Sequence, residues 1–127
     1  MPQARERLLT HDPDRYRDEL WWREERPELG MGPASWRWVE RGYASLRLLE
    51  EPGAMEAVET PIFLMSTSND KLVSHDAVVR AASRLPNAQL LTFGEEAHHE
   101  ILREGDEVRR RAMDGVGKFL DQVAPAR

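Results

Sequence analysis

In the first part of the chain, apolar residues recur every three or four positions, as they do along one face of an amphipathic helix. A first helix is predicted from Asp12 to Pro27, because Asp is a favoured N-cap and a proline ends a helix. A second helix is predicted to open at Pro33 and to stop before Pro52. Residues 1–11 show only polarity, and the first several of them are expected to fray.

Beyond this region the pattern changes to short apolar runs. Strands are predicted at Ile62–Met65 and Ala88–Phe93, with a helix capped by Ser74 between them. A last helix is predicted from Gly105 or the residue after it. A short continuous apolar run is typical of a strand buried on both faces in a parallel sheet. The predicted fold class is therefore α/β, with two amphipathic helices followed by βαβα and a parallel strand pair.

Composition narrows the class of protein. The 127 residues are one domain's worth, and a net charge of -5 with a pI near 5.4 argues against a nucleic-acid partner. The chain has no cysteine, which excludes disulfides and thiol nucleophiles. No run reaches the roughly 18 apolar residues of a membrane span, and the start is too polar for a secretory signal. We expect a cytoplasmic protein without a cofactor.

The first candidate site pairs Asp70 with His99. Each residue follows one of the two predicted strands, and adjacent parallel strands present reactive groups at their carboxyl ends. An aspartate that accepts the imidazole N–H fixes the tautomer and leaves the other ring nitrogen free to take a proton. The alternative is that Asp70 caps the following turn and that His99 is a loop histidine.

A second candidate is a metal site. It would comprise His98, His99 and Glu100, with His75 and Asp76 as further ligands. Adjacent histidines point in different directions on a helix or a strand, and zinc motifs more often space them four residues apart. We therefore expect no metal here.

A third candidate is the concentration of aromatic residues in the two N-terminal helices. Such a stripe is most often ordinary core, but it could also line an acyl pocket or rest on a membrane interface. Its members are Tyr16, Trp21, Trp22, Trp36, Trp38 and Tyr43.

Several of these segments resemble a known family. The segment A-H-H-E-I-L at 97–102 is similar to the A-R-H-E-I-L segment that bears the catalytic histidine of α/β-hydrolases of the lysophospholipase and monoacylglycerol lipase kind. Further similar segments are N-D-K-L-V at 69–73, where the family places its acid, and the cap-like stretches 9–16 and 32–36. The chain thus resembles the C-terminal half of such an enzyme over roughly residues 8–123.

The resemblance implies a role for each part of the chain. Residues 1–52 would form a helical cap and residues 53–127 the C-terminal segment of the hydrolase core. Asp70 would be the catalytic acid and His99 the catalytic base, while His98 stands where the family often has arginine. The cap residues expected to bind substrate are Trp21, Trp22, Trp36, Trp38 and Tyr43.

The chain also departs from the family pattern. Ser66–Ser68 occupy a turn where the family usually has glycines, and no serine of the chain lies in a G-x-S-x-G elbow, which in this fold precedes the acid and the histidine. We therefore expect a partial α/β-hydrolase fold that is inactive by itself. The expected partners are a small-molecule or lipid ester, a peripheral membrane surface, and either a second copy or a complementing N-terminal hydrolase segment.

Two other functions stay open at this stage. The chain could be a non-catalytic binding module derived from a truncated hydrolase, using its aromatic residues or an open strand edge. It could also belong to an aspartate-nucleophile or peptidase branch of the same fold, because the fold alone does not fix the substrate.

Overall fold

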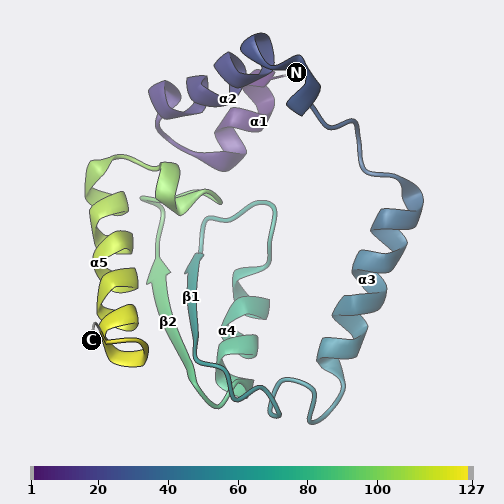
Figure 1. The fold of residues 1–127 in the computed structure, drawn as a ribbon, viewed down its shortest axis with the longest axis vertical. Coiled ribbons are helices and arrows are strands. Elements are labelled where there is room, and N and C mark those ends of the chain that lie inside the picture. Colours follow the sequence, from purple (N-terminus) through teal and green to yellow (C-terminus); the bar gives the residue numbers. More distant parts are fainter. Residues whose placement is uncertain (1, 126–127) are drawn as a thin grey trace.

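The computed structural model describes residues 2–125, and two parallel strands lie at its centre (Figure 1). Strand β1 (Ile62–Thr67) pairs with β2 (Ala88–Phe93), with Ile62 opposite Ala88 and Thr67 opposite Phe93. The parallel pair and the bounds of β2 are as predicted, whereas β1 runs two residues further. The first four residues of β1 are only half-buried, so the expectation of burial on both faces is wrong for them.

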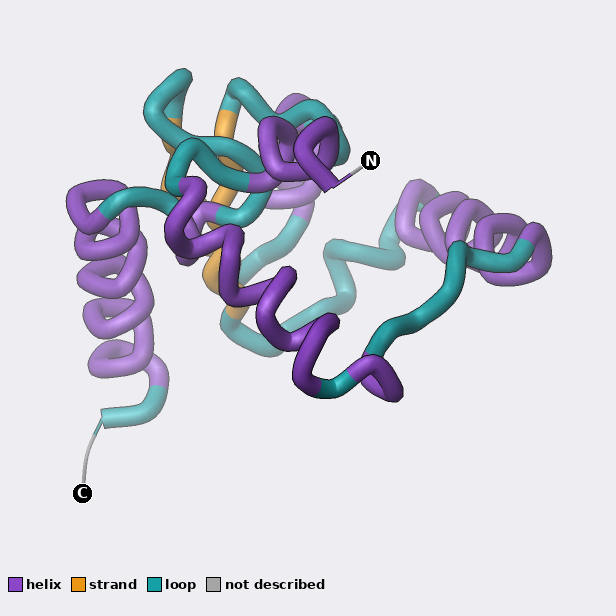
Figure 2. The backbone as a smooth tube through the Cα atoms, turned by 90° about the horizontal axis from the view of Figure 1, so that it is seen from above, coloured by secondary structure: helices purple, strands orange, loops and turns teal. Residues whose placement is uncertain are grey.

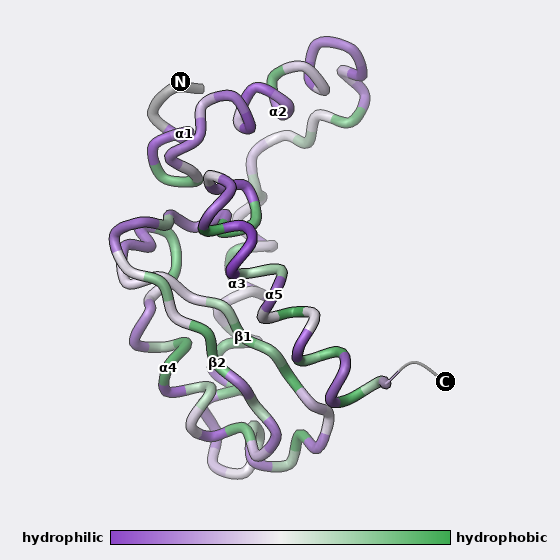
Figure 3. The backbone as a smooth tube through the Cα atoms, turned by 90° about the vertical axis from the view of Figure 1, so that its left-hand side faces the viewer, coloured by the Kyte–Doolittle hydropathy of each residue, from purple (hydrophilic) through white to green (hydrophobic). Residues whose placement is uncertain are grey.

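Two helices cover opposite faces of this pair (Figures 1 and 3). Helix α4 (His75–Arg84) begins after Ser74, whose side chain accepts a hydrogen bond from the N–H of Ala77, as predicted. Helix α5 (Asp106–Val123) follows Gly105, also as predicted. A Cβ at Gly115 would lie 2.9 Å from the Phe63 ring, so this glycine allows α5 to pack closely on the sheet.

The N-terminal region contains one more helix than the sequence predicts. Helix α1 (Pro2–Leu9) precedes α2 (Pro13–Glu25), so the expectation that the first several residues fray is wrong for those that the structure describes. Tertiary contacts order this segment: Leu9 is buried, and its carbonyl accepts a hydrogen bond from the N–H of Glu100 at 2.8 Å. Asp12 caps α2 as predicted, by accepting from two N–H groups of the first turn.

Helix α3 (Trp36–Glu50) stands apart from the strands and from α2 (Figures 1 and 2). The prediction places its start at Pro33, but the helix begins three residues later because the Ser35 side chain caps it by accepting a hydrogen bond from the N–H of Trp38. Short 3₁₀ turns lie at Pro27–Leu29 and Ile101–Arg103. None of the helices in the described part of the chain is both long and apolar enough to cross a membrane.

The hydrophobic core lies where the end of β2, the following loop and α5 meet. Its buried residues are Phe93, Ala97, Ile101 and Ala112. Figure 3 shows the hydrophobic stretches gathering along β1 and β2, between α4 and α5. The core therefore anchors the loop of residues 94–104, which carries the adjacent histidines His98 and His99. The division of the chain at residue 52 stays a prediction.

Candidate active site

Asp70 and His99 lie together at the carboxyl ends of the two strands. His99 Nδ1 is 2.8 Å from Asp70 Oδ2, with the Asp70 side chain 9% exposed and the His99 side chain 35% exposed. The other Asp70 oxygen, Oδ1, accepts hydrogen bonds from the N–H groups of Leu72 and Val73 at 2.8 and 2.9 Å. The two interpretations of Asp70 thus hold at once, since it caps its turn and also binds the imidazole.

Thr67 joins the loop of Asp70 to the loop of His99. Its hydroxyl is fully buried, and its oxygen lies 2.8 Å from the carbonyl oxygens of both Gly94 and Ala97, which share its single proton. The same oxygen accepts from the N–H of Asn69 at 3.1 Å. A buried hydroxyl with three partners fixes the backbone of the loop that carries Asp70 and of the loop that carries His99. The turn that replaces the family's glycines is therefore well connected.

The environment of Asp70 keeps its carboxylate charged. Burial raises the pKa of Asp70, but the hydrogen bonds from His99, Val73 and Leu72 more than offset this, so the pKa is lowered overall. An ionised carboxylate only accepts hydrogen bonds, so Nδ1 of His99 carries the proton between them. In the neutral imidazole, Nε2 is then the ring nitrogen that can accept a proton. His99 lines a shallow hollow together with Met65 and residues 100–103.

We expect Asp70→Asn to change how stability depends on pH. Because the pKa of Asp70 is lower in the folded than in the unfolded state, its stabilisation is present above the ordinary carboxyl pKa of about 4 and is lost as the pH falls further. In urea unfolding, the wild type should exceed Asp70→Asn in stability by more at about pH 6 than at about pH 3. The exposed Asp121→Asn is the control. An equal difference at both pH values would contradict the assignment.

The histidines and Glu100 of the metal site considered in the sequence analysis each contact a different partner. His99 pairs with Asp70, while His75 Nδ1 lies 2.9 Å from Ser66 Oγ. Glu100 accepts a hydrogen bond from Arg103 at 2.6 Å. His98 instead stacks on the ring of His11, with centroids 3.6 Å apart and planes 12° apart. The structure therefore does not assemble that grouping.

The aromatic residues are mostly on the surface, so the interpretation as core is wrong for all of them except Tyr16. Trp21 and Trp22 on α2 meet edge to face at 4.7 Å and are about half exposed. Helix α3 stands apart from α2 and from the strand ends, and its aromatic side chains are 62–90% exposed. These α3 residues are Trp36, Trp38 and Tyr43. Their role in substrate binding stays a prediction.

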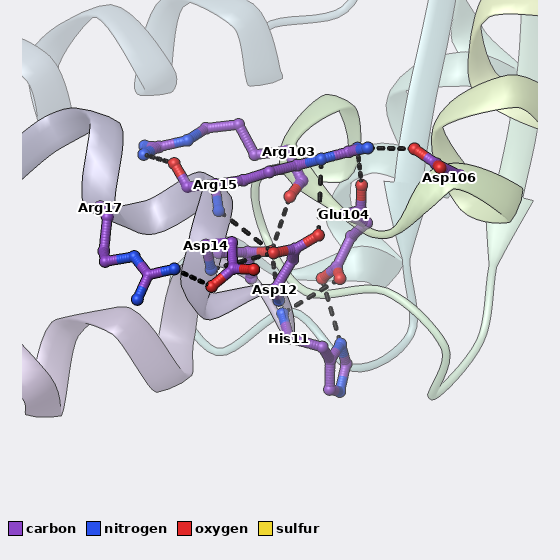
Figure 4. A network of polar contacts seen from close by, with 9 residues as sticks. His11, Asp12, Asp14, Arg15, Arg17, Arg103, Glu104 and Asp106 are labelled. Atoms are coloured by element: carbon purple, nitrogen blue, oxygen red, sulfur yellow. Dashed lines mark hydrogen bonds and ion pairs between the residues drawn. The ribbon is translucent and has the colours of Figure 1, made fainter.

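Sequence reasoning missed the role of Glu104, which lies in a polar network (Figure 4). The Glu104 side chain is 1% exposed and accepts hydrogen bonds from the N–H of His11 at 3.0 Å and the N–H of His98 at 2.6 Å. His11 Nδ1 lies 3.1 Å from its Oε1. Arg15 bonds both the Glu104 carbonyl and the Asp106 carboxylate. This network joins the start of α2 to the loop of His99.

Comparisons with known proteins support the α/β class defined by this fold and site. No family model matches the sequence. A structure of a soluble variant of monoglyceride lipase from Saccharomyces cerevisiae, solved with a substrate analogue, matches with a TM-score of 0.63 and 17% identity. The match covers 91% of this chain, so the chain has part of the fold of that α/β-hydrolase.

A relative in sequence points the same way. The chain is 28% identical over 95 residues to a probable lysophospholipase L2 of Haemophilus influenzae, a match that covers 75% of this chain. The two likenesses confirm the resemblance to hydrolases of the lysophospholipase and monoglyceride lipase kind. The matched parts make up only 29% of the lysophospholipase and 41% of the lipase chain.

Proposed function

We propose that this chain is the C-terminal part of a serine ester hydrolase that acts on lysophospholipids or monoacylglycerols. The observation that supports this most is the contact of His99 Nδ1 with Asp70 Oδ2 at the ends of two parallel strands. The names of the two similar proteins support a lipid ester as the substrate class.

In this proposal His99 is both general base and general acid. Its Nε2 takes the proton from a serine hydroxyl as that oxygen attacks the ester carbonyl, and then gives the proton to the departing alcohol. Asp70 holds the ring in the required tautomer and stabilises the imidazolium that forms. The exposed aromatic residues of α2 and α3 hold the acyl chain or contact a membrane surface.

In this proposal, residues outside this chain of 127 supply the serine and the oxyanion hole, because no serine of the sequence lies in G-x-S-x-G. Each strand of the described sheet has one neighbour, which leaves the outer edge of β1 available for further pairing. We propose that a complementing N-terminal hydrolase segment, or a second copy of the chain, pairs there. We further propose that the protein acts in the cytoplasm.

A second function, a non-catalytic binding module, is favoured by one observation. Trp36 and Trp38 of α3 are 90% and 69% exposed, and an exposed aromatic surface is common at sites of association. A module of this kind would bind its partner equally well after His99→Ala, whereas the hydrolase needs His99 for turnover.

The isolated 127-residue chain is expected to show no turnover of a short-chain p-nitrophenyl ester above the background of the His99→Ala variant. Without a serine nucleophile, His99 has no hydroxyl to deprotonate, and without an oxyanion hole the tetrahedral intermediate is not stabilised. The measurement is release of p-nitrophenol by purified chain. Robust turnover that disappears in His99→Ala would show that the chain carries its own nucleophile and would overturn this part of the proposal.

A further inference from the structure

Three groups with metal-binding atoms converge beside the Asp70–His99 pair without belonging to it. One nitrogen from each of His11 and His98 and one oxygen of Glu104 lie within 4.8 Å of one another. His98 and Glu104 lie six residues apart in the loop of His99, whereas His11 lies at the start of α2, 93 residues before Glu104. Figure 4 shows His11 next to Glu104. We propose that the three residues form a binding site for a zinc ion.

The types of ligand suit zinc. Zinc binds imidazole nitrogen and carboxylate oxygen at about 2.0–2.2 Å, and sites with three protein ligands keep a fourth position for water. Ligand atoms around such an ion lie about 3.3 Å apart, closer than the present limit of 4.8 Å. The His11 side chain is 46% exposed, so it can rotate out of its stack on His98 to reach the ion.

An unpartnered nitrogen supplies an independent reason for a ligand at this place. Nδ1 of His98 is buried and is the side-chain atom found without a hydrogen-bond partner among the buried polar groups of the described residues. Leaving a buried polar atom without a partner is energetically unfavourable. Coordination to a metal ion would satisfy this nitrogen, which neither the stack with His11 nor the loop backbone does.

Glu104 is already held in position to act as a ligand. Its two oxygens accept hydrogen bonds from the backbone N–H groups of His11 and His98. Hydrogen bonds of this kind orient ligating carboxylates in metal sites. A carboxylate offers about four lone-pair positions, and the two amides use two of them. The ion would take the position that the His11 imidazole now occupies at Oε1. Bound zinc would therefore clamp the start of α2 to the loop that carries His99.

The test is a calorimetric titration of the untagged, metal-free 127-residue chain with zinc ions, in the wild type and in each single His→Ala variant. The chain has four histidines, so the set is complete. We expect one zinc per chain in the wild type and affinity at least about tenfold weaker in His11→Ala and His98→Ala. The matched controls His75→Ala and His99→Ala should bind like the wild type. Zinc should also raise the melting temperature of the wild type and of both controls.

Circular dichroism of each variant checks that it is folded, and because the His11 ring is half exposed, His11→Ala decides the outcome if His98→Ala unfolds. The proposal is overturned if the wild type binds no zinc. It is also overturned if folded His11→Ala binds zinc as tightly as the wild type, or if His75→Ala and His99→Ala lose as much affinity as His11→Ala.

Discussion

Glu104→Ala is expected to destabilise the chain by about 3 kcal/mol, because two N–H groups lose a charged acceptor with which they pair in the buried network. These are the backbone N–H groups of His11 and His98, at 3.0 and 2.6 Å from the carboxylate. A loss of this size is a large part of the roughly 5–15 kcal/mol that holds a typical domain folded. The measurement is urea unfolding in the presence of EDTA, so that no metal contributes.

The exposed Glu107→Ala serves as the matched control, with an expected change of at most about 0.5 kcal/mol. Glu104→Gln keeps one acceptor oxygen and should fall between the control and Glu104→Ala. If Glu104→Ala unfolds at the same urea concentration as Glu107→Ala, the network does not hold the start of α2 against the loop of His99.

Much of the central α/β unit could be predicted from the sequence because its signals are local. Ser74 and Gly105 mark the starts of α4 and α5, and the apolar run 88–93 has the length of a strand. The Asp70–His99 contact follows from the same pattern, since each residue comes just after one of two neighbouring parallel strands. The pattern alone left open that His99 is a loop histidine, and the resemblance to the hydrolase family favoured the pair.

The N-terminal helix and the Glu104 network could not be predicted in this way. Helix α1 has a polar composition and no strong start signal, and its order depends on contacts such as the one between the Leu9 carbonyl and the N–H of Glu100. Glu104 and His11 are 93 residues apart, and no spacing rule relates them. His11 lies in the cap-like stretch 9–16 and Glu104 follows the segment 97–102, so the resemblance to the hydrolase family is the signal that could have related them.

The aromatic residues show that the spacing of apolar residues can predict the apolar face of a helix but not whether another element packs against that face. The spacing in residues 36–46 correctly predicts an amphipathic helix, α3. Several of its large apolar residues are nevertheless exposed, among them Tyr43 at 62% and Leu46 at 56%. Burial depends on a neighbouring element at the right distance, and in the described part of the chain α3 stands apart from the sheet (Figure 1).

The proposed roles of Asp70 and His99, as acid and base of an ester hydrolase whose nucleophile lies elsewhere, can be tested by restoring the nucleophile. A segment of an α/β-hydrolase that carries the G-x-S-x-G elbow is fused before residue 1, and ester turnover of the folded fusion is measured with and without His99→Ala. Loss of a triad histidine leaves the serine without a base and costs about 10⁴-fold or more in rate. The control is His75→Ala, which removes an imidazole that is hydrogen-bonded to the Ser66 hydroxyl.

We expect the fusion to turn over the ester, His99→Ala to lower its rate by about 10⁴-fold or more, and His75→Ala to change it little. Equal turnover by the wild-type fusion and its folded His99→Ala variant would contradict the role of His99 as the catalytic base.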